Sequence, residues 1–113
     1  MKQMLIPGLV AIMLAGGAAA ASAQSSAADG EKVFAAQKCT ICHSVAGVGN
    51  KKGPLDSVGA KLSADDIRLW ITHAPEMAAK TKAVRKPVMK AYASLSKVEV
   101  DALVAYLQTL KKG

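Results

Sequence analysis

The chain has 113 residues, of which 51% are hydrophobic and 4% aromatic, and its formal net charge at pH 7 is +7. A domain of this size with so few aromatic side chains needs a covalent or metal staple, or a large apolar cofactor, to complete its core. The positive charge favours acidic partners or an anionic membrane surface, and it does not predict nucleic acid because no recognition motif accompanies the lysines.

The first 23 residues predict a signal peptide. Residues 5–21 are an almost unbroken apolar run after a positive start, and residues 21–23 (Ala-Ser-Ala) provide the small side chains that a signal peptidase requires. We expect cleavage before Gln24, a mature domain of residues 24–113, and a periplasmic location. A retained membrane anchor is the alternative, which the proline and glycines inside the run disfavour.

The first predicted helix covers about residues 28–39 and leads into the motif Cys39-Thr40-Ile41-Cys42-His43. Cysteines three positions apart on a helical turn lie on the same side, so both thiols can form thioethers with the two vinyl groups of one haem. The adjacent histidine then places a ring nitrogen on the iron. The motif therefore predicts one covalently attached haem c per chain, held by Cys39 and Cys42 and ligated by His43.

Other chemistries use two cysteines at this spacing. A thioredoxin-like pair lies in a βαβ context, and no strand pattern flanks this motif. A lone disulfide across so short a loop would stabilise little, and a zinc site needs four ligands, where the chain has only one other histidine, His73. Haem attachment agrees best with the motif, the export signal and the helical context.

The middle of the chain predicts a loop followed by a helix. Residues 45–56 contain several glycines and Pro54, which favour a loop. Ser63 is an N-cap residue with two acidic residues after it, and its helix should end before Pro75. Trp70 on this helix is expected in the core or the wall of the haem pocket, or with its indole N–H on a haem propionate.

The second axial ligand has three candidates. Residues 76–81 predict a short helical turn and residues 82–93 an extended basic loop. Met89 is preferred because its loop can wrap over the far side of the haem, whereas Met77 lies in a helical setting that suits core packing. His73 and an open sixth position are the remaining alternatives.

The last helix has the clearest boundaries. Ser96 and Glu99 match a capping box, and apolar residues from Val100 to Leu110 recur on one face. No stretch alternates between apolar and polar residues long enough to predict a sheet. The predicted fold class is therefore all-α, with about four helices packed around one covalently bound haem.

Together these features resemble class I cytochrome c, the family of small, soluble monohaem proteins, in its bacterial periplasmic type. The resemblance covers nearly the whole of residues 24–113. Gly30 and Phe34 resemble the N-terminal helix signature of the family, and Leu103 and Tyr106 resemble its partner on the terminal helix. This resemblance implies that the two helices cross at close range, with Gly30 allowing the approach.

The resemblance also implies roles in two loops. Gly53-Pro54-Leu55 resembles the family loop whose proline carbonyl accepts a hydrogen bond from the second nitrogen of the haem histidine, so Pro54 would orient that histidine. An ordinary turn proline is the alternative. Pro87-Val88-Met89 resembles the axial-methionine loop, with one departure: Lys90 stands where the family usually has proline.

The predicted function is one-electron transfer between periplasmic redox partners, with His43 and Met89 filling both axial positions of the iron. The protein would be an electron carrier rather than an enzyme, and a monomer outside a complex. The alternative is a haem-bearing subunit fixed in a periplasmic oxidoreductase complex. A five-coordinate enzyme or gas sensor would require that Met89 not bind.

The expected partners are acidic redox proteins or an oxidoreductase complex, with the membrane surface only as a peripheral contact. Five cations surround the methionine and predict a docking patch, although a solvated basic loop explains them almost as well: Lys80, Lys82, Arg85, Lys86 and Lys90.

Overall fold

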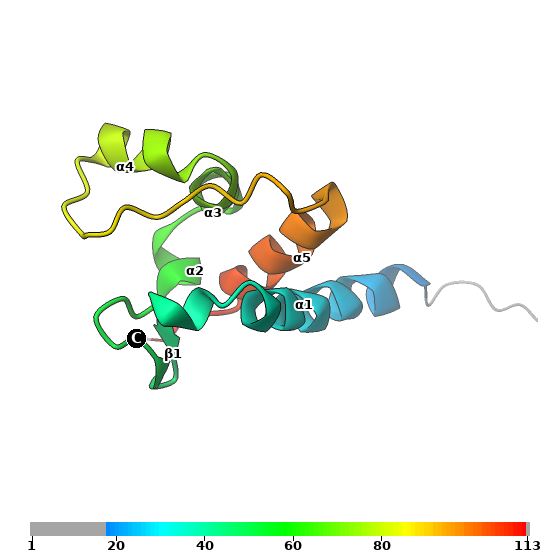
Figure 1. Cartoon of the computed structure of the whole chain (residues 1–113). Helices are drawn as coiled ribbons and strands as arrows, with labels where there is room; N and C mark the ends of the chain where they lie inside the picture. The colour runs from blue at the N-terminus through cyan, green and yellow to red at the C-terminus, as the bar shows by residue number, and fades with distance from the viewer. Residues whose placement is uncertain (1–17, 113) are drawn as a thin grey trace, which may run out of the picture.

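The computed structural model describes residues 18–112 (Figure 1). Its elements in chain order are α1 (Ala18–Ala36), the 3-10 turn η1 (Cys39–Ile41), β1 (Ser44–Val45), β2 (Val48–Gly49), α2 (Val58–Lys61), α3 (Ala64–Thr72), α4 (Ala74–Thr81) and α5 (Lys97–Gln108). β1 and β2 form one short antiparallel hairpin. The fold is mainly helical, which confirms the predicted class.

Most of the predicted signal peptide, residues 1–23, lies outside the described residues, so its removal before Gln24 stays a prediction. None of the helices in the part of the chain that the structure describes combines the length and apolar content of a membrane span.

The contact between α1 and α5 forms the centre of the domain (Figure 1). A Cβ at Gly30 would overlap the backbone carbonyl of Ala102, so only glycine allows this approach. One turn further on, the rings of Phe34 and Tyr106 pack edge to face, with centroids 5.6 Å apart. The close helix crossing implied by the family resemblance is therefore present, and it is located at Gly30.

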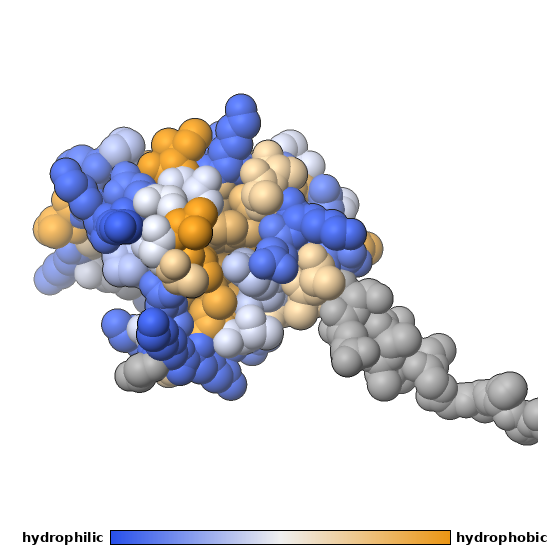
Figure 2. Space-filling view, turned by 90° about the horizontal axis from the view of Figure 1, so that it is seen from below, coloured by the Kyte–Doolittle hydropathy of each residue, from blue (hydrophilic) through white to orange (hydrophobic). Residues whose placement is uncertain are grey.

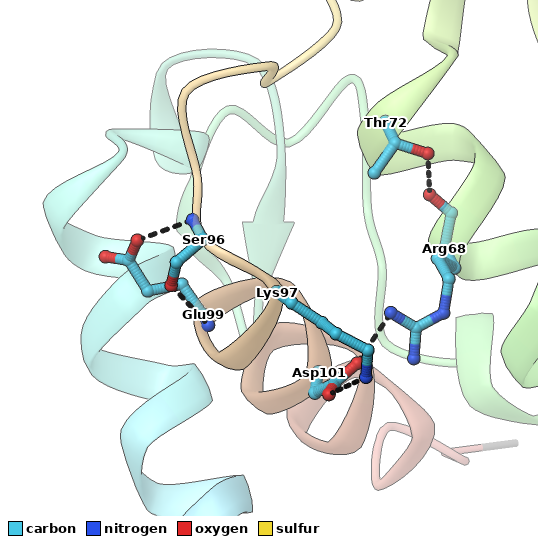
Figure 3. Close-up of polar contacts among 6 residues, drawn as sticks. All are labelled: Arg68, Thr72, Ser96, Lys97, Glu99 and Asp101. Carbon is cyan, nitrogen blue, oxygen red and sulfur yellow. Dashed lines mark hydrogen bonds and ion pairs between the residues drawn. The ribbon is translucent and has the colours of Figure 1, made fainter.

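The buried core joins α1, α3 and α5. Its members are the apolar side chains that the helical periodicity predicts: Phe34, Ile67, Ile71, Val100, Leu103, Val104 and Leu107. At the edge of this core, an ion pair of 2.6 Å between Arg68 and Asp101 connects α3 to α5 (Figure 3). Hydrogen bonds from Lys97 and Arg68 hold the pKa of the Asp101 carboxyl below its usual value.

The predicted helix starts after Ser63 and Ser96 are confirmed. The Ser63 hydroxyl accepts a hydrogen bond of 3.1 Å from the backbone N–H of Asp66, at the start of α3. In the capping box of α5, the Glu99 N–H donates to the Ser96 hydroxyl at 3.1 Å, and the Ser96 N–H donates to the Glu99 carboxylate at 2.9 Å (Figure 3). These contacts are local, which is why sequence alone locates them.

Other boundaries differ from the predictions. The first α-helix ends at Ala36 rather than Cys39, because Lys38 adopts a left-handed conformation (φ 57°) and the chain then forms the 3-10 turn. The predicted turn at 76–81 is an eight-residue helix that begins at Ala74, with Pro75 in its first turn, where proline needs no hydrogen-bond partner. The one-turn helix α2 lacks a pattern long enough to predict.

Candidate functional site

A cavity of about 850 Å³ lies between η1, α2, α3, α5 and the loop of residues 82–96. In Figure 1, η1 and the hairpin lie below this region, while α4 and the loop that follows it lie above. Apolar surface also reaches the outside of the molecule, because Figure 2 shows a band of hydrophobic side chains between hydrophilic ones on one face. The cavity provides the space that the sparse aromatic content leaves unfilled.

The five predicted site residues come together around this cavity. Cys39, Cys42, His43, Pro54 and Met89 all line it, although they come from separate segments of the chain. Trp70 lines it as well, which agrees with the predicted place in a pocket wall.

The two other ligand candidates lie elsewhere. Met77 is buried in α4 and does not line the cavity, as expected for core packing. His73 is exposed at the junction of α3 and α4, where its Nδ1 lies 2.8 Å from the Thr72 hydroxyl. Of the three candidates, only Met89 reaches the cavity.

The 3-10 turn keeps both cysteines on one side. The N–H groups of Cys42 and His43 both donate to the Cys39 carbonyl, at 3.2 and 2.9 Å. The two thiols are free of disulfide bonds. Burial raises the pKa of the Cys39 thiol to about 11, so this thiol keeps its proton at neutral pH. Two free thiols on one turn are the groups that form thioethers with two vinyl groups.

The His43 ring is held by the loop that follows the hairpin. Its Nδ1 lies 3.1 Å from the Gly53 carbonyl, and donation to this acceptor leaves Nε2 with a free lone pair. Burial lowers the pKa of His43 most strongly, the Gly53 hydrogen bond opposes this, and the Arg85 charge lowers the pKa further. The imidazole is therefore neutral at pH 7, as metal coordination requires.

The residue that orients His43 differs by one position from the prediction. Pro54 was expected to supply the carbonyl, but the acceptor is Gly53. A parallel bridge between Ser44 and Pro54 explains this difference, because it turns the Gly53 carbonyl toward the Ser44 N–H, at 3.0 Å, and toward the ring. Pro54 still lines the cavity, directly beside the residue that makes the hydrogen bond.

Sequence reasoning missed the importance of Gly53 and Arg85. A Cβ at Gly53 would overlap the Arg85 guanidinium and the Cys42 carbonyl, so the position has no room for a side chain. The only signal in the sequence is a glycine immediately before a proline, which also marks ordinary turns. Arg85 belongs to the loop that carries Met89. No sequence pattern indicates that its side chain contacts Gly53, in the loop after the β1–β2 hairpin (called the histidine loop below).

The methionine loop is tied down at Tyr92. The Tyr92 N–H donates to the Ile71 carbonyl of α3 at 2.9 Å, and the Lys90 ammonium lies 5.1 Å from the centre of the Tyr92 ring. Burial raises the pKa of the Tyr92 hydroxyl. The charged residues that line the cavity are all basic within residues 18–112: Lys38, Lys61, Arg85 and Lys90.

These groups fit a covalently attached haem. Two free thiols on one turn, a neutral imidazole with one available nitrogen and a thioether surround a largely apolar space. The basic rim also matches the two carboxylates that a haem carries.

The comparison with family models agrees with this geometry. The model of the cytochrome c family, described as "Cytochrome c", matches residues 27–111, so this chain belongs to the cytochrome c family. Membership in this family supports haem-based electron transfer and implies covalently bound haem c.

One curated relative is a "Cytochrome c oxidase subunit 2" from Alkalihalophilus pseudofirmus. The two sequences are 30% identical over 97 residues, which cover 78% of this chain and 27% of the relative. The chain therefore spans about a quarter of the length of that protein. No solved structure matches the chain.

Proposed function

We propose that this protein transfers single electrons through one haem c, attached to Cys39 and Cys42, with His43 and Met89 as the axial ligands of the iron. The observation that carries the proposal is the convergence of these four residues, from two distant segments, on one apolar cavity. Haem would supply the one-electron couple, and the chain would hold and insulate it.

Each residue has a distinct task in this proposal. The Gly53 carbonyl holds the His43 ring through Nδ1, which leaves Nε2 available to a metal and would make that nitrogen a stronger ligand. Met89 would supply its thioether as the second ligand, which would leave no site for a substrate and would raise the reduction potential. Apolar lining residues from α3 and α5 keep water away, which limits the rearrangement that accompanies a change of iron charge.

We further propose that the protein is exported to the periplasm after removal of residues 1–23. Haem attachment at such a motif takes place outside the cytoplasm, so the two proposals support each other. N-terminal sequencing of the exported protein tests the second one, with Gln24 as the expected first residue.

The partners proposed here are acidic redox proteins. The cavity rim is basic, and Lys80, Lys82 and Lys86 extend this charge along α4 and the following loop. Such a surface speeds encounter with acidic partners and allows rapid release.

The similarity to a cytochrome c oxidase subunit 2 favours a second candidate, an electron-transfer subunit of an oxidoreductase complex. The same ligands would serve in both cases. Gel filtration of a native extract separates the two candidates, because a free carrier elutes as a monomer and a subunit elutes with its partner.

The decisive experiment is expression with a haem-maturation system, followed by mass measurement and visible spectra of the exported protein. We expect the polypeptide mass plus one haem, and the weak far-red band that marks methionine on ferric haem. Colourless protein with the mass of the bare polypeptide would exclude the proposal. Coloured protein that lacks the band and binds carbon monoxide rapidly would exclude Met89 as the ligand.

A further inference from the structure

Arg85 connects the loop that carries Met89 to the loop after the β1–β2 hairpin, whose Gly53 carbonyl holds the His43 ring. It lies four residues before Met89 in the loop between α4 and α5, and it lines the cavity. Its guanidinium packs against Gly53, so closely that a Cβ on Gly53 would overlap both Nη1 and Cζ. Arg85 therefore extends from the methionine loop to the residue whose carbonyl holds the His43 ring.

Within residues 18–112, no protein carboxylate neutralises the charge of Arg85. Its guanidinium makes no ion pair or hydrogen bond within residues 18–112, and no carboxylate of this region lines the cavity. A guanidinium stays protonated at every physiological pH, so the positive charge beside the histidine loop is permanent.

Lys86 provides an internal comparison. It is the next residue, it carries the same charge and, like Arg85, it is exposed, but it does not line the cavity. Any effect of net charge alone would be shared by both residues. An effect that depends on the contact with Gly53 would be seen only when Arg85 is substituted.

We propose that Arg85 is a positioning residue that places a permanent positive charge against the His43 loop and thereby raises the reduction potential of the bound haem. This inference rests on the proposed function, because it requires a haem ligated by His43.

The physical reason is the difference in charge between the two oxidation states. Oxidation adds one positive charge at the metal, and a nearby cation repels this charge. Both cations are exposed to water, but Arg85 also lies against Gly53 and lines the cavity, so part of the space between its charge and a metal held by His43 would be protein, which screens less than water. Arg85 should therefore favour the reduced state more than Lys86 does.

The test compares exported wild-type protein with Arg85→Gln, Arg85→Lys and Lys86→Gln. All four proteins are checked by mass for one attached haem and by the far-red band for methionine ligation, and their midpoint potentials are then measured. In Arg85→Gln we expect the equilibrium to move toward the oxidised form by roughly three- to tenfold, with the far-red band retained. The shift should be less than about twofold in Lys86→Gln, whose charge is screened by water, and Arg85→Lys should restore most of the wild-type potential.

Three results would overturn the inference. Equal shifts in Arg85→Gln and Lys86→Gln would show that only net charge matters. A potential in Arg85→Lys as low as in Arg85→Gln would show that the charge is not the cause. Loss of the far-red band in Arg85→Gln would show that Arg85 acts on the methionine instead. If wild-type protein carries no haem by mass, the proposed function itself fails, which the first measurement separates from the other outcomes.

Discussion

The two sides of the cavity are built differently. On the histidine side, backbone hydrogen bonds join residues 40–55 into a compact unit: Asn50 donates to the Thr40 and His43 carbonyls, Gly53 donates to Asn50, and Ser44 exchanges bonds with Gly53 and Leu55. On the methionine side, residues 84–91 make no backbone hydrogen bond and are mostly exposed, and the loop is tied to α3 at Tyr92.

The histidine side is therefore positioned by local hydrogen bonds, whereas the methionine side is positioned by tertiary contacts. The histidine side can hold its ring before the rest of the domain packs, because its hydrogen bonds span short sequence distances. The methionine side depends on its contact with α3 at Tyr92, and would depend on the haem, to keep its position. We therefore expect the methionine loop to open more easily than the histidine loop.

The largest effect should follow from loss of haem attachment. Because residues on both sides of the cavity would pack against the haem, we expect Cys39→Ala combined with Cys42→Ala to yield little folded protein. Far-UV circular dichroism and thermal melting measure this result, and the two single variants serve as controls that keep one thioether. Normal helical content and a cooperative melt in the double variant would contradict the expectation.

Substitution of the buried Met77 should affect stability, whereas substitution of the cavity-lining Met89 should affect the haem spectrum. Met77→Ala should lower the free energy of unfolding by about 2–5 kcal/mol, because it creates a void beneath α4, while the far-red band of the ferric protein remains. Met89→Ala should abolish that band and lower the reduction potential, with helical content unchanged.

Spectra and chemical denaturation of the two variants, measured in parallel, distinguish a ligand from a core residue. A far-red band that survives in Met89→Ala but disappears in Met77→Ala would reverse the assignment.

A smaller effect is expected on the histidine side from Gly53→Ala. The new Cβ overlaps the Cys42 carbonyl, which belongs to the backbone and cannot move aside freely, so we expect a loss of roughly 1–3 kcal/mol. Gly47→Ala is the matched control in the same region, because a Cβ there meets no atom within 4 Å and the cost is limited to its left-handed backbone (φ 81°). Denaturant unfolding that ranks Gly47→Ala as the worse variant would argue against a tight histidine side.

The smallest expected effect is the influence of salt on the rate of electron transfer, which depends on the basic residues of the methionine loop. If this loop steers acidic partners, the rate of electron transfer to an acidic redox protein should fall as ionic strength rises. Stopped-flow measurement over a salt series tests this expectation. A rate that does not depend on salt would show that the lysines form an ordinary solvated loop and do not steer partners.

Sequence reasoning was most successful where the interaction is local. The caps at Ser63 and Ser96 need only residues three positions away, and both are present in the structure. The end of α1 was placed too late because the left-handed conformation of Lys38 has no signature in the residue type. The one-position difference between Pro54 and Gly53 arises from pairing with Ser44, a contact ten residues away that spacing alone does not define.

By itself the sequence determined the family, the helical class and the attachment motif, because two cysteines and a histidine on one turn form a site through local geometry alone. Tertiary structure decided which ligand candidate reaches the cavity, which carbonyl holds the His43 ring, and that Arg85 returns to the histidine loop. These outcomes depend on contacts between segments that lie ten or more residues apart in the sequence, and such contacts leave no periodic pattern in the chain.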